Sequence, residues 1–279
     1  MSQWADLHIH TTFSDSTLSP LDVVKDAYKN GVDCIGITDH DTVAGILPTI
    51  NEAKKYNIEV VPAIELSSEL NGRDIHVLGY YFDYHNAAFV NQLSSMQNTR
   101  VERMDKMIGK LHDLFGINNI SLKEVCALAG TKSVGRPHLA TKLIEKGWVS
   151  DIPTAFNKFI GERAPAYVPK FKQTPQEAVQ FIHKAGGAAV LAHPVITQID
   201  ELIPQLVASG LDGLEVYYPN VSGNITRFYE GMAQKHDLVM TGGSDAHGTA
   251  KVYEYIGMVK VSYARVEELK KRAERYKKI

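Results

Sequence analysis

Histidine and carboxylate residues recur in this sequence directly after short apolar runs. The first stretch is ADLHIHTTFSDST, in which His8 and His10 are two residues apart and Asp15 follows five residues after the second. The same residue types return in ITDHD, PAIEL, IHVLGYY, LAHP and GGSDAH. Imidazole nitrogens and carboxylate oxygens are the ligands that suit divalent Zn, Mn and Fe. The pattern therefore indicates metal chemistry.

Six histidines and three acids make up the candidate ligand set: His8, His10, Asp15, His40, Glu65, His76, His193, Asp245 and His247. Residues i and i+2 of a strand face the same side, so His8 and His10 can bind one ion together. Asp245 and His247 have the same spacing. A bridging carboxylate lets two ions approach to roughly 3.5–4 Å, and Glu65 is the candidate bridge. Four histidines lack acid partners and are expected to be ordinary polar residues: His85, His112, His183 and His236.

The elements that must position these residues are short strands alternating with helices. Apolar runs predict strands at residues 33–37, 59–66, 75–82, 187–192, 213–218 and 237–243. Residues 19–31 and 174–187 carry helix start and stop signals, namely a hydroxyl cap, a proline and a closing glycine. This alternation predicts parallel strands with helical crossovers, so the fold class is α/β and barrel-like.

In such barrels the loops after the carboxyl ends of the strands build the active site, and the candidate ligands would meet there. His76 fits this rule less well, because it precedes the apolar part of its run.

The middle of the chain breaks the alternation. Residues 86–172 are mostly of helical pattern, and we expect a helical insertion there that contributes to the substrate pocket. Residues 1–85 and 173–279 would form the barrel. The last segment, 266–279, predicts a solvated basic helix, with nucleic-acid binding as the alternative.

Composition excludes several classes of protein. The 279 residues are 44% hydrophobic and 22% charged, with a net charge of -2, so no global basic field favours nucleic acid. Two cysteines give no disulfide framework and fit a reducing compartment. Neither a signal peptide nor an apolar run of about 20 residues is evident. We expect a cytoplasmic protein with no membrane partner and no obligate protein partner.

Six motifs together resemble the PHP (polymerase and histidinol phosphatase) family of metal-dependent phosphoesterases. They are DLHIHTTFSDST, GITDHDT, IEL, IHVLGYY, LAHP and GGSDAHG, and they run from residue 6 to residue 248. The resemblance implies a distorted (β/α)7 barrel with two or three metal ions at the carboxyl mouth. Every expected ligand position is filled, which argues against a non-catalytic copy of the kind attached to some DNA polymerases.

The resemblance also implies three ion sites. The first site comprises His8, His10, Glu65 and Asp245. The second comprises Glu65, His76 and His193, with Glu65 bridging. The third comprises Asp15, His40 and His247. Such ligands accept several metals with little discrimination, and we favour Mn, with Zn or Fe as alternatives.

The implied reaction is hydrolysis of a phosphate monoester. A metal-bound hydroxide attacks phosphorus in line, and phosphate and an alcohol are released. The residues that would hold this hydroxide and its metals are Glu65, His76, His193 and Asp245. The protein mainly supplies position and electrostatic stabilisation, and the sequence singles out no general acid for the leaving group.

Within the family, the chain resembles the subgroup that dephosphorylates nucleoside 3′,5′-bisphosphates, some of whose members also trim short RNA from the 5′ end. The position of the insertion and the segment SVGRPHLA carry this match. Arg136 offers a planar fork for bidentate phosphate binding, and His138 could contact the phosphate or approach the metals. Alternatively, Arg136 is a surface residue of a helix that begins at Pro137.

Two further positions stay open. In APAYVPK, Tyr167 could stack on a base and Lys170 could pair with a second phosphate, but core packing or solvent exposure suits both equally. Glu215 follows a strand near the expected site, where it could support a ligand or be purely structural.

The substrate is thus predicted to be a phosphorylated small molecule or nucleotide, with short RNA as a further candidate. One alternative is a histidinol-phosphate or other small-molecule phosphatase, or a cyclic phosphodiesterase, on the same metal core. The other is a non-catalytic metal-binding module.

Overall fold

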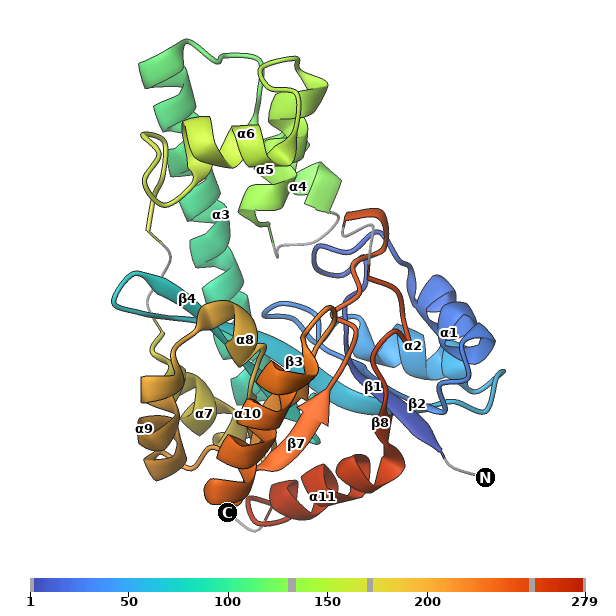
Figure 1. Ribbon diagram of the computed structural model, residues 1–279. Coiled ribbons are helices and arrows are strands. Elements are labelled where there is room, and N and C mark those ends of the chain that lie inside the picture. Colours follow the sequence, from blue (N-terminus) through green and yellow to red (C-terminus); the bar gives the residue numbers. More distant parts are fainter. Residues whose placement is uncertain (1–2, 130–133, 170–172, 251–253, 278–279) are drawn as a thin grey trace.

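The computed structural model describes residues 3–129, 134–169, 173–250 and 254–277. Within these residues, eight strands form one sheet in the order β7-β6-β5-β4-β3-β2-β1-β8 (Figure 1). The strands are β1 (Trp4–Ile9), β2 (Cys34–Ile37), β3 (Glu59–Leu70), β4 (Arg73–Tyr80), β5 (Ala188–Leu191), β6 (Gly213–Tyr217), β7 (Val239–Gly242) and β8 (Val261–Ser262). Beyond β7, Ala246 forms a parallel bridge with Ile9 of β1, which nearly closes the sheet. The predicted α/β barrel class is confirmed.

Strand β4 gives the barrel its distortion. It runs antiparallel to both β3 and β5, whereas β1, β2 and β3 are parallel to one another, as are β5, β6 and β7. The short edge strand β8 pairs antiparallel with β1. The amino end of β4 therefore lies at the edge where the parallel strands end. His76 pairs with Ser67 in this hairpin. The reversed direction explains why His76 precedes the apolar part of its strand.

Helices cover the barrel, and two of them begin at the predicted start signals. They are α1 (Pro20–Lys29), α2 (Ile46–Ala53), α7 (Pro175–Lys184), α8 (Pro194–Thr197), α9 (Ile203–Ala208), α10 (Gly223–Lys235) and α11 (Tyr263–Ala273), with 3-10 turns η2 (Asp200–Leu202) and η3 (Gly248–Ala250). Ser19 and Asp22 form a reciprocal capping box at α1, and Thr174 and Glu177 form one at α7. Each box satisfies amide groups that a helix start leaves unpaired.

Residues between β4 and α7 form a helical region that Figure 1 shows rising from the barrel. It contains α3 (Ala87–Phe115), α4 (Leu122–Ala129), α5 (Arg136–Glu145), α6 (Ile152–Ala155) and a π-helical turn, η1 (Phe156–Ile160). Met104, Met107 and Leu111 of α3 belong to a separate apolar core with α4, α5 and η1. The first turns of α3 instead pack through Phe89 and Leu93 onto the barrel core. Helix α3 is thus shared by both cores, and a domain boundary at residue 86 stays a prediction.

In the part of the chain that the structure describes, no helix combines the length and apolar character needed to cross a membrane. Cys34 and Cys126 are both free thiols. The cytoplasmic location stays a prediction.

Candidate metal centre

The nine side chains of the candidate ligand set meet at one end of the barrel. Three of them lie within strands: His8 in β1, Glu65 in β3 and His76 in β4. The other six follow strands: His10 and Asp15 follow β1, His40 follows β2, His193 follows β5, and Asp245 and His247 follow β7. Asp15 and His76, the most exposed of them, are each only 19% exposed. The fold therefore brings together residues that span almost the whole sequence. We call these nine residues the histidine–carboxylate cluster.

Glu65 lies at the centre of the histidine–carboxylate cluster. Its Oε1 is 2.7 Å from Nδ1 of His76 and 3.0 Å from Nε2 of His193. Its Oε2 is close to three further ring nitrogens: Nε2 of His8 (3.2 Å), Nε2 of His10 (3.1 Å) and Nδ1 of His40 (3.3 Å). One carboxylate thus contacts five imidazoles, as the candidate bridge requires.

The first group of potential ligands combines His8, His10, Glu65 and Asp245, whose donor atoms all lie within 4.8 Å of one another. Nε2 of His8 and Nε2 of His10 are 3.1 Å apart, because the two rings leave the same face of β1. Oδ1 of Asp245 is 3.1 Å from Nε2 of His10. This is the set that the family resemblance implies for the first ion.

Two further groups surround Glu65 and Asp15. His40 and His76 join Glu65 in one group, which His193 approaches through Oε1 of Glu65. In the other group, Nε2 of His247 lies 3.3 Å and Nε2 of His40 lies 3.7 Å from the Asp15 carboxylate. His10 also belongs to the group that contains Asp15, His40 and His247.

Glu254 is a potential ligand that the sequence analysis missed. A carboxylate oxygen of Glu254 and potential ligand atoms of Asp245 and His247 all lie within 4.8 Å of one another. No apolar strand precedes Glu254, and it lies outside the motifs that carried the family resemblance. Only the folding of the loop after β7 brings it to the histidine–carboxylate cluster.

The pKa shifts in the histidine–carboxylate cluster differ from one side chain to the next. Burial alone would raise the pKa of the Glu65 carboxyl, but His40, His76 and His8 hold it well below its usual range. Burial holds the pKa of His40 well below its usual value, which favours the neutral ring. Among the residues that the structure describes, Nδ1 of His193 and Nε2 of His76 are buried and have no hydrogen-bond partner. Burial alone would lower the pKa of His8, His10 and His193, but the neighbouring carboxylates raise it, in His10 to about 9, so a metal ion would displace protons from these rings. Imidazole nitrogens and ionised carboxylates are donors that fit Zn, Mn or Fe.

Glu215 and Tyr218 hold members of the histidine–carboxylate cluster in place. Oε1 of Glu215 is 2.9 Å from Nδ1 of His8, and its Oε2 accepts a hydrogen bond of 2.7 Å from the His193 amide. The Tyr218 hydroxyl donates to Oδ2 of Asp245 at 2.7 Å. Glu215 thereby fixes the His8 ring with Nε2 toward Glu65, as in metal sites where a carboxylate orients a histidine ligand.

Asp39 adjoins His40 but does not belong to any of the groups of potential ligands. It supports the site through hydrogen bonds instead. Its carboxylate accepts hydrogen bonds of 2.7 Å from the Thr11 amide, the Thr11 hydroxyl and the Ser14 hydroxyl. These bonds shape the turn that carries Asp15 toward His40 and away from His8.

Of the predicted substrate residues, Arg136 and His138 lie at the start of α5. Nη2 of Arg136 donates to Oδ2 of Asp74 at 3.2 Å, and Nδ1 of His138 accepts from the Gly135 amide at 3.0 Å. Burial lowers the pKa of His138, with the Asp15 charge acting in the opposite direction. His138 is therefore close enough to the histidine–carboxylate cluster to sense its charge. Lys170 lies outside the described residues.

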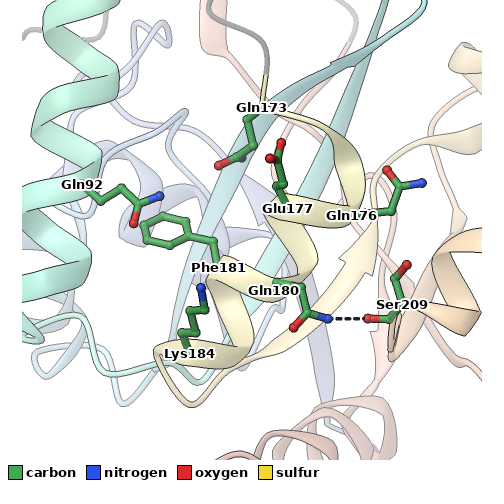
Figure 2. Close-up of a pocket in the computed structure, with 8 residues that line it drawn as sticks. All are labelled: Gln92, Gln173, Gln176, Glu177, Gln180, Phe181, Lys184 and Ser209. Carbon is green, nitrogen blue, oxygen red and sulfur yellow. Dashed lines mark hydrogen bonds between the residues drawn. The ribbon is translucent and has the colours of Figure 1, made fainter.

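A separate pocket of about 570 Å³ lies between α3 and α7 (Figure 2). Its wall carries amide side chains such as Gln92 and Gln180, and Gln180 donates to the Ser209 carbonyl at 2.7 Å. None of the nine cluster residues lines it. This pocket offers no constellation for phosphoester chemistry.

Comparison with known proteins agrees with the site. The PHP domain model matches residues 6–149. A 5′-3′ exoribonuclease from Haemophilus influenzae is 34% identical, over 88% of this chain and 91% of that protein. A 3′,5′-nucleoside bisphosphate phosphatase from Chromobacterium violaceum is 30% identical, over 87% of this chain and 86% of that protein. A solved structure assigned as a metal-dependent phosphoesterase, from Bifidobacterium adolescentis, superposes with a TM-score of 0.86 at 28% identity, covering 96% of both chains.

A barrel with a histidine–carboxylate cluster at its mouth defines a metal-dependent phosphoesterase, a hydrolase of phosphoric ester bonds. The chain belongs to the PHP family. The family and enzyme class predicted from the sequence are confirmed.

Proposed function

We propose that this chain removes the 3′-phosphate of nucleoside 3′,5′-bisphosphates and that short RNA is a further substrate. The observation that carries the proposal is the position of Arg136. This arginine of the insertion contacts Asp74, which is two residues from His76 and on the same face of β4. A side chain whose geometry suits phosphate binding thus lies near the histidine–carboxylate cluster. Two relatives support these substrates by name: the bisphosphate phosphatase from Chromobacterium violaceum and the exoribonuclease from Haemophilus influenzae.

We propose two or three divalent ions in the cluster, with Mn favoured and Zn or Fe as alternatives. The first ion would be held by His8, His10, Glu65 and Asp245, the second by Glu65, His76 and His193, and the third by Asp15, His40 and His247. Such ions lower the pKa of bound water toward neutrality and polarise phosphoryl oxygens.

The remaining roles belong to side chains of the chain itself. Arg136 binds a phosphate of the substrate through its planar guanidinium, and His138 contacts the same substrate from the start of α5. Glu215 keeps His8 in the orientation that directs Nε2 into the cluster. Hydrolysis breaks the bond between phosphorus and the 3′ oxygen, so the products are inorganic phosphate and a nucleoside 5′-monophosphate.

The test is a comparison of initial rates with Mn-loaded protein. We expect adenosine 3′,5′-bisphosphate to give AMP and phosphate, with a kcat/KM at least about a hundredfold above that of histidinol phosphate or a cyclic ribose phosphate. A faster reaction with either of the latter substrates would overturn the proposed substrate while leaving the enzyme class intact.

Exonuclease activity on short RNA is a second candidate, favoured by the 34% identical relative named for that activity. We expect a 5′-phosphorylated trinucleotide to release mononucleotides from its 5′ end. Release from the 3′ end first would contradict this candidate.

A further inference from the structure

Asp6 of β1 is a fully buried carboxylate that belongs to none of the groups of potential ligands in the described part of the chain. It lies two residues before His8, so both side chains leave the same face of the strand and point into the barrel. Within the described residues, Asp6 takes part in no ion pair, and its carboxylate accepts hydrogen bonds from backbone amides instead. Such bonds allow a carboxylate to be buried.

The amides that Asp6 binds lie at the two ends of one segment. Oδ1 of Asp6 accepts from the Ser244 amide at 2.9 Å, and Oδ2 accepts from the Gly257 amide at 2.8 Å. We call residues 244–257, of which 244–250 and 254–257 are described, the clasped segment. One carboxylate thus ties the start of this segment to its end. The clasped segment carries three potential metal ligands: Asp245, His247 and Glu254.

The start of the clasped segment fits closely against β1. A Cβ atom at Gly243 would lie 2.4 Å from the His8 nitrogen and 2.9 Å from Oδ1 of Asp6, so this approach requires glycine. The Asp245 amide donates to the His8 carbonyl at 2.8 Å, and Asp245 has a left-handed backbone with φ of 50°. A residue other than glycine keeps this conformation only where its surroundings impose it. The hydrogen bonds of the Ser244 and Asp245 amides impose it here.

The end of the clasped segment has a second, outer attachment. Asn30, the residue after α1, donates from Nδ2 to the Ile256 carbonyl at 2.7 Å. The next residue, Gly257, has φ of +82° and directs its amide to Asp6. The end of the segment is therefore held from outside by Asn30 and from inside the barrel by Asp6.

The clasped segment serves only part of the histidine–carboxylate cluster. Asp245 belongs to the first proposed ion site and His247 to the third. The second proposed site takes no ligand from this segment, because its residues come from β3, β4 and the loop after β5: Glu65, His76 and His193. Loosening the clasped segment should therefore affect the ions unequally.

We propose that Asp6 is a positioning residue that sets the affinity of the cluster for the ions that Asp245 and His247 would hold. It does so by tying both ends of the clasped segment to β1. The inference rests on the proposed function, which supplies the ion sites, and deepens it by assigning part of the metal affinity to a residue that is not a ligand. Residues that hold metal ligands in place change metal affinity by about tenfold to a hundredfold when they are replaced.

The experiment titrates the chelator-stripped full chain with Mn and follows free Mn²⁺ by its electron paramagnetic resonance signal. Wild-type protein should bind two or three ions. Asp6→Asn keeps the size of the side chain but has one acceptor oxygen, so it can hold only one end of the clasped segment. All ions except one should bind about tenfold to a hundredfold more weakly, and that one should keep its wild-type affinity. Asp6→Ala, which has no acceptor, should weaken the same ions further.

Asp212→Asn is the matched control. Asp212 is also buried, and it accepts from the Ala189 amide at 3.0 Å and from the Tyr276 hydroxyl at 3.1 Å. It directly precedes β6 and so lies at the amino end of the parallel strands, whereas the cluster lies at their carboxyl ends. Both variants should unfold at lower urea concentration than wild type. Only the Asp6 variants should lose metal affinity.

The outcomes separate this inference from the proposed function. Wild-type affinity for every ion in Asp6→Asn would overturn the inference, and so would an equal loss for all ions or the same loss in Asp212→Asn. Phosphate release is measured separately on the Mn-loaded wild type. If that protein leaves adenosine 3′,5′-bisphosphate intact, the proposed substrate is wrong, while the binding data alone decide the role of Asp6.

A second variant applies if the Asp6 variants do not fold. Asn30→Ala removes the outer attachment of the clasped segment without changing the barrel interior. It should weaken the same ions as Asp6→Asn, by a smaller factor, and leave one ion at wild-type affinity. Unchanged binding of every ion in Asn30→Ala would then contradict control of metal affinity by this segment.

Discussion

The nine side chains of the histidine–carboxylate cluster come from barrel strands and the loops that directly follow them, whereas Arg100, Arg103 and Arg136 come from two helices of the insertion. The paired strands position the first set, because His8, Glu65 and His76 lie within the sheet and the other six residues follow strand ends. Side-chain contacts position the second set, such as the Tyr167 ring between Arg103 and Arg136. We propose a division of labour, in which the barrel performs hydrolysis and the insertion selects the substrate.

The largest expected effect comes from a change in the cluster. Asp245→Asn should lower kcat/KM by about a thousandfold or more with every phosphoester, because an amide replaces a charged ligand. Asp237→Asn is the control, since Asp237 is exposed and, in the described part of the chain, its carboxylate accepts from Arg272 and not from a cluster residue. Phosphate release and bound metal are measured on both variants. A folded Asp245→Asn protein with wild-type turnover would remove Asp245 from the mechanism.

Glu215→Gln should weaken metal binding by about tenfold to a hundredfold and leave kcat largely recoverable at saturating Mn. Oε1 of Glu215 faces Nδ1 of His8, and its Oε2 accepts a hydrogen bond from the His193 amide. A glutamine side chain has one oxygen and could accept only one of these two hydrogen bonds. The measurement is a Mn titration followed by calorimetry. Glu230→Gln is the matched control, because Glu230 accepts from Tyr217 away from the cluster. Unchanged Mn affinity in Glu215→Gln would show that Glu215 does not orient His8.

Arg136→Gln sharpens the comparison from the side of the insertion. It should raise KM for adenosine 3′,5′-bisphosphate by about tenfold, or about 1.4 kcal/mol, through loss of a charged phosphate contact. Bound metal should stay at the wild-type level, because Arg136 is outside the cluster. Lys142→Gln on the same helix is the control. Loss of metal in Arg136→Gln would contradict the division of labour.

The smallest effect concerns the stability of the insertion. Hydrogen bonds from Lys146 and Ser121 lower the pKa of Glu124 from 4.5 to about 2. A depressed pKa contributes stability above the unfolded value, which is lost as the pH falls toward the folded value. The urea midpoint of Glu124→Gln should therefore lie below that of wild type at pH 7, and the gap should narrow steadily between pH 5 and pH 2. A gap that widens on acidification would contradict this linkage.

The sequence predicts the histidine–carboxylate cluster better than the placement of the arginines in the insertion, for a physical reason. Ligands such as His193 and Asp245 follow apolar strands, and a barrel brings strand ends together. The direction of β4 could not be foreseen, because an apolar run carries no sign of parallel or antiparallel pairing, and so His76 looked misplaced. Arg100 and Arg103 are one helical turn apart, which in sequence resembles a solvated helix face. Only the packing of α3 and α5 shows that Arg103 is buried.

The most direct test of the central claim is phosphate release from adenosine 3′,5′-bisphosphate by chelator-stripped protein, before and after addition of Mn. The account predicts no measurable release from the stripped protein and full recovery when two or three Mn ions are bound per chain. Undiminished release by protein shown to contain no metal would contradict it, as would the absence of release after loading with Mn, Zn or Fe.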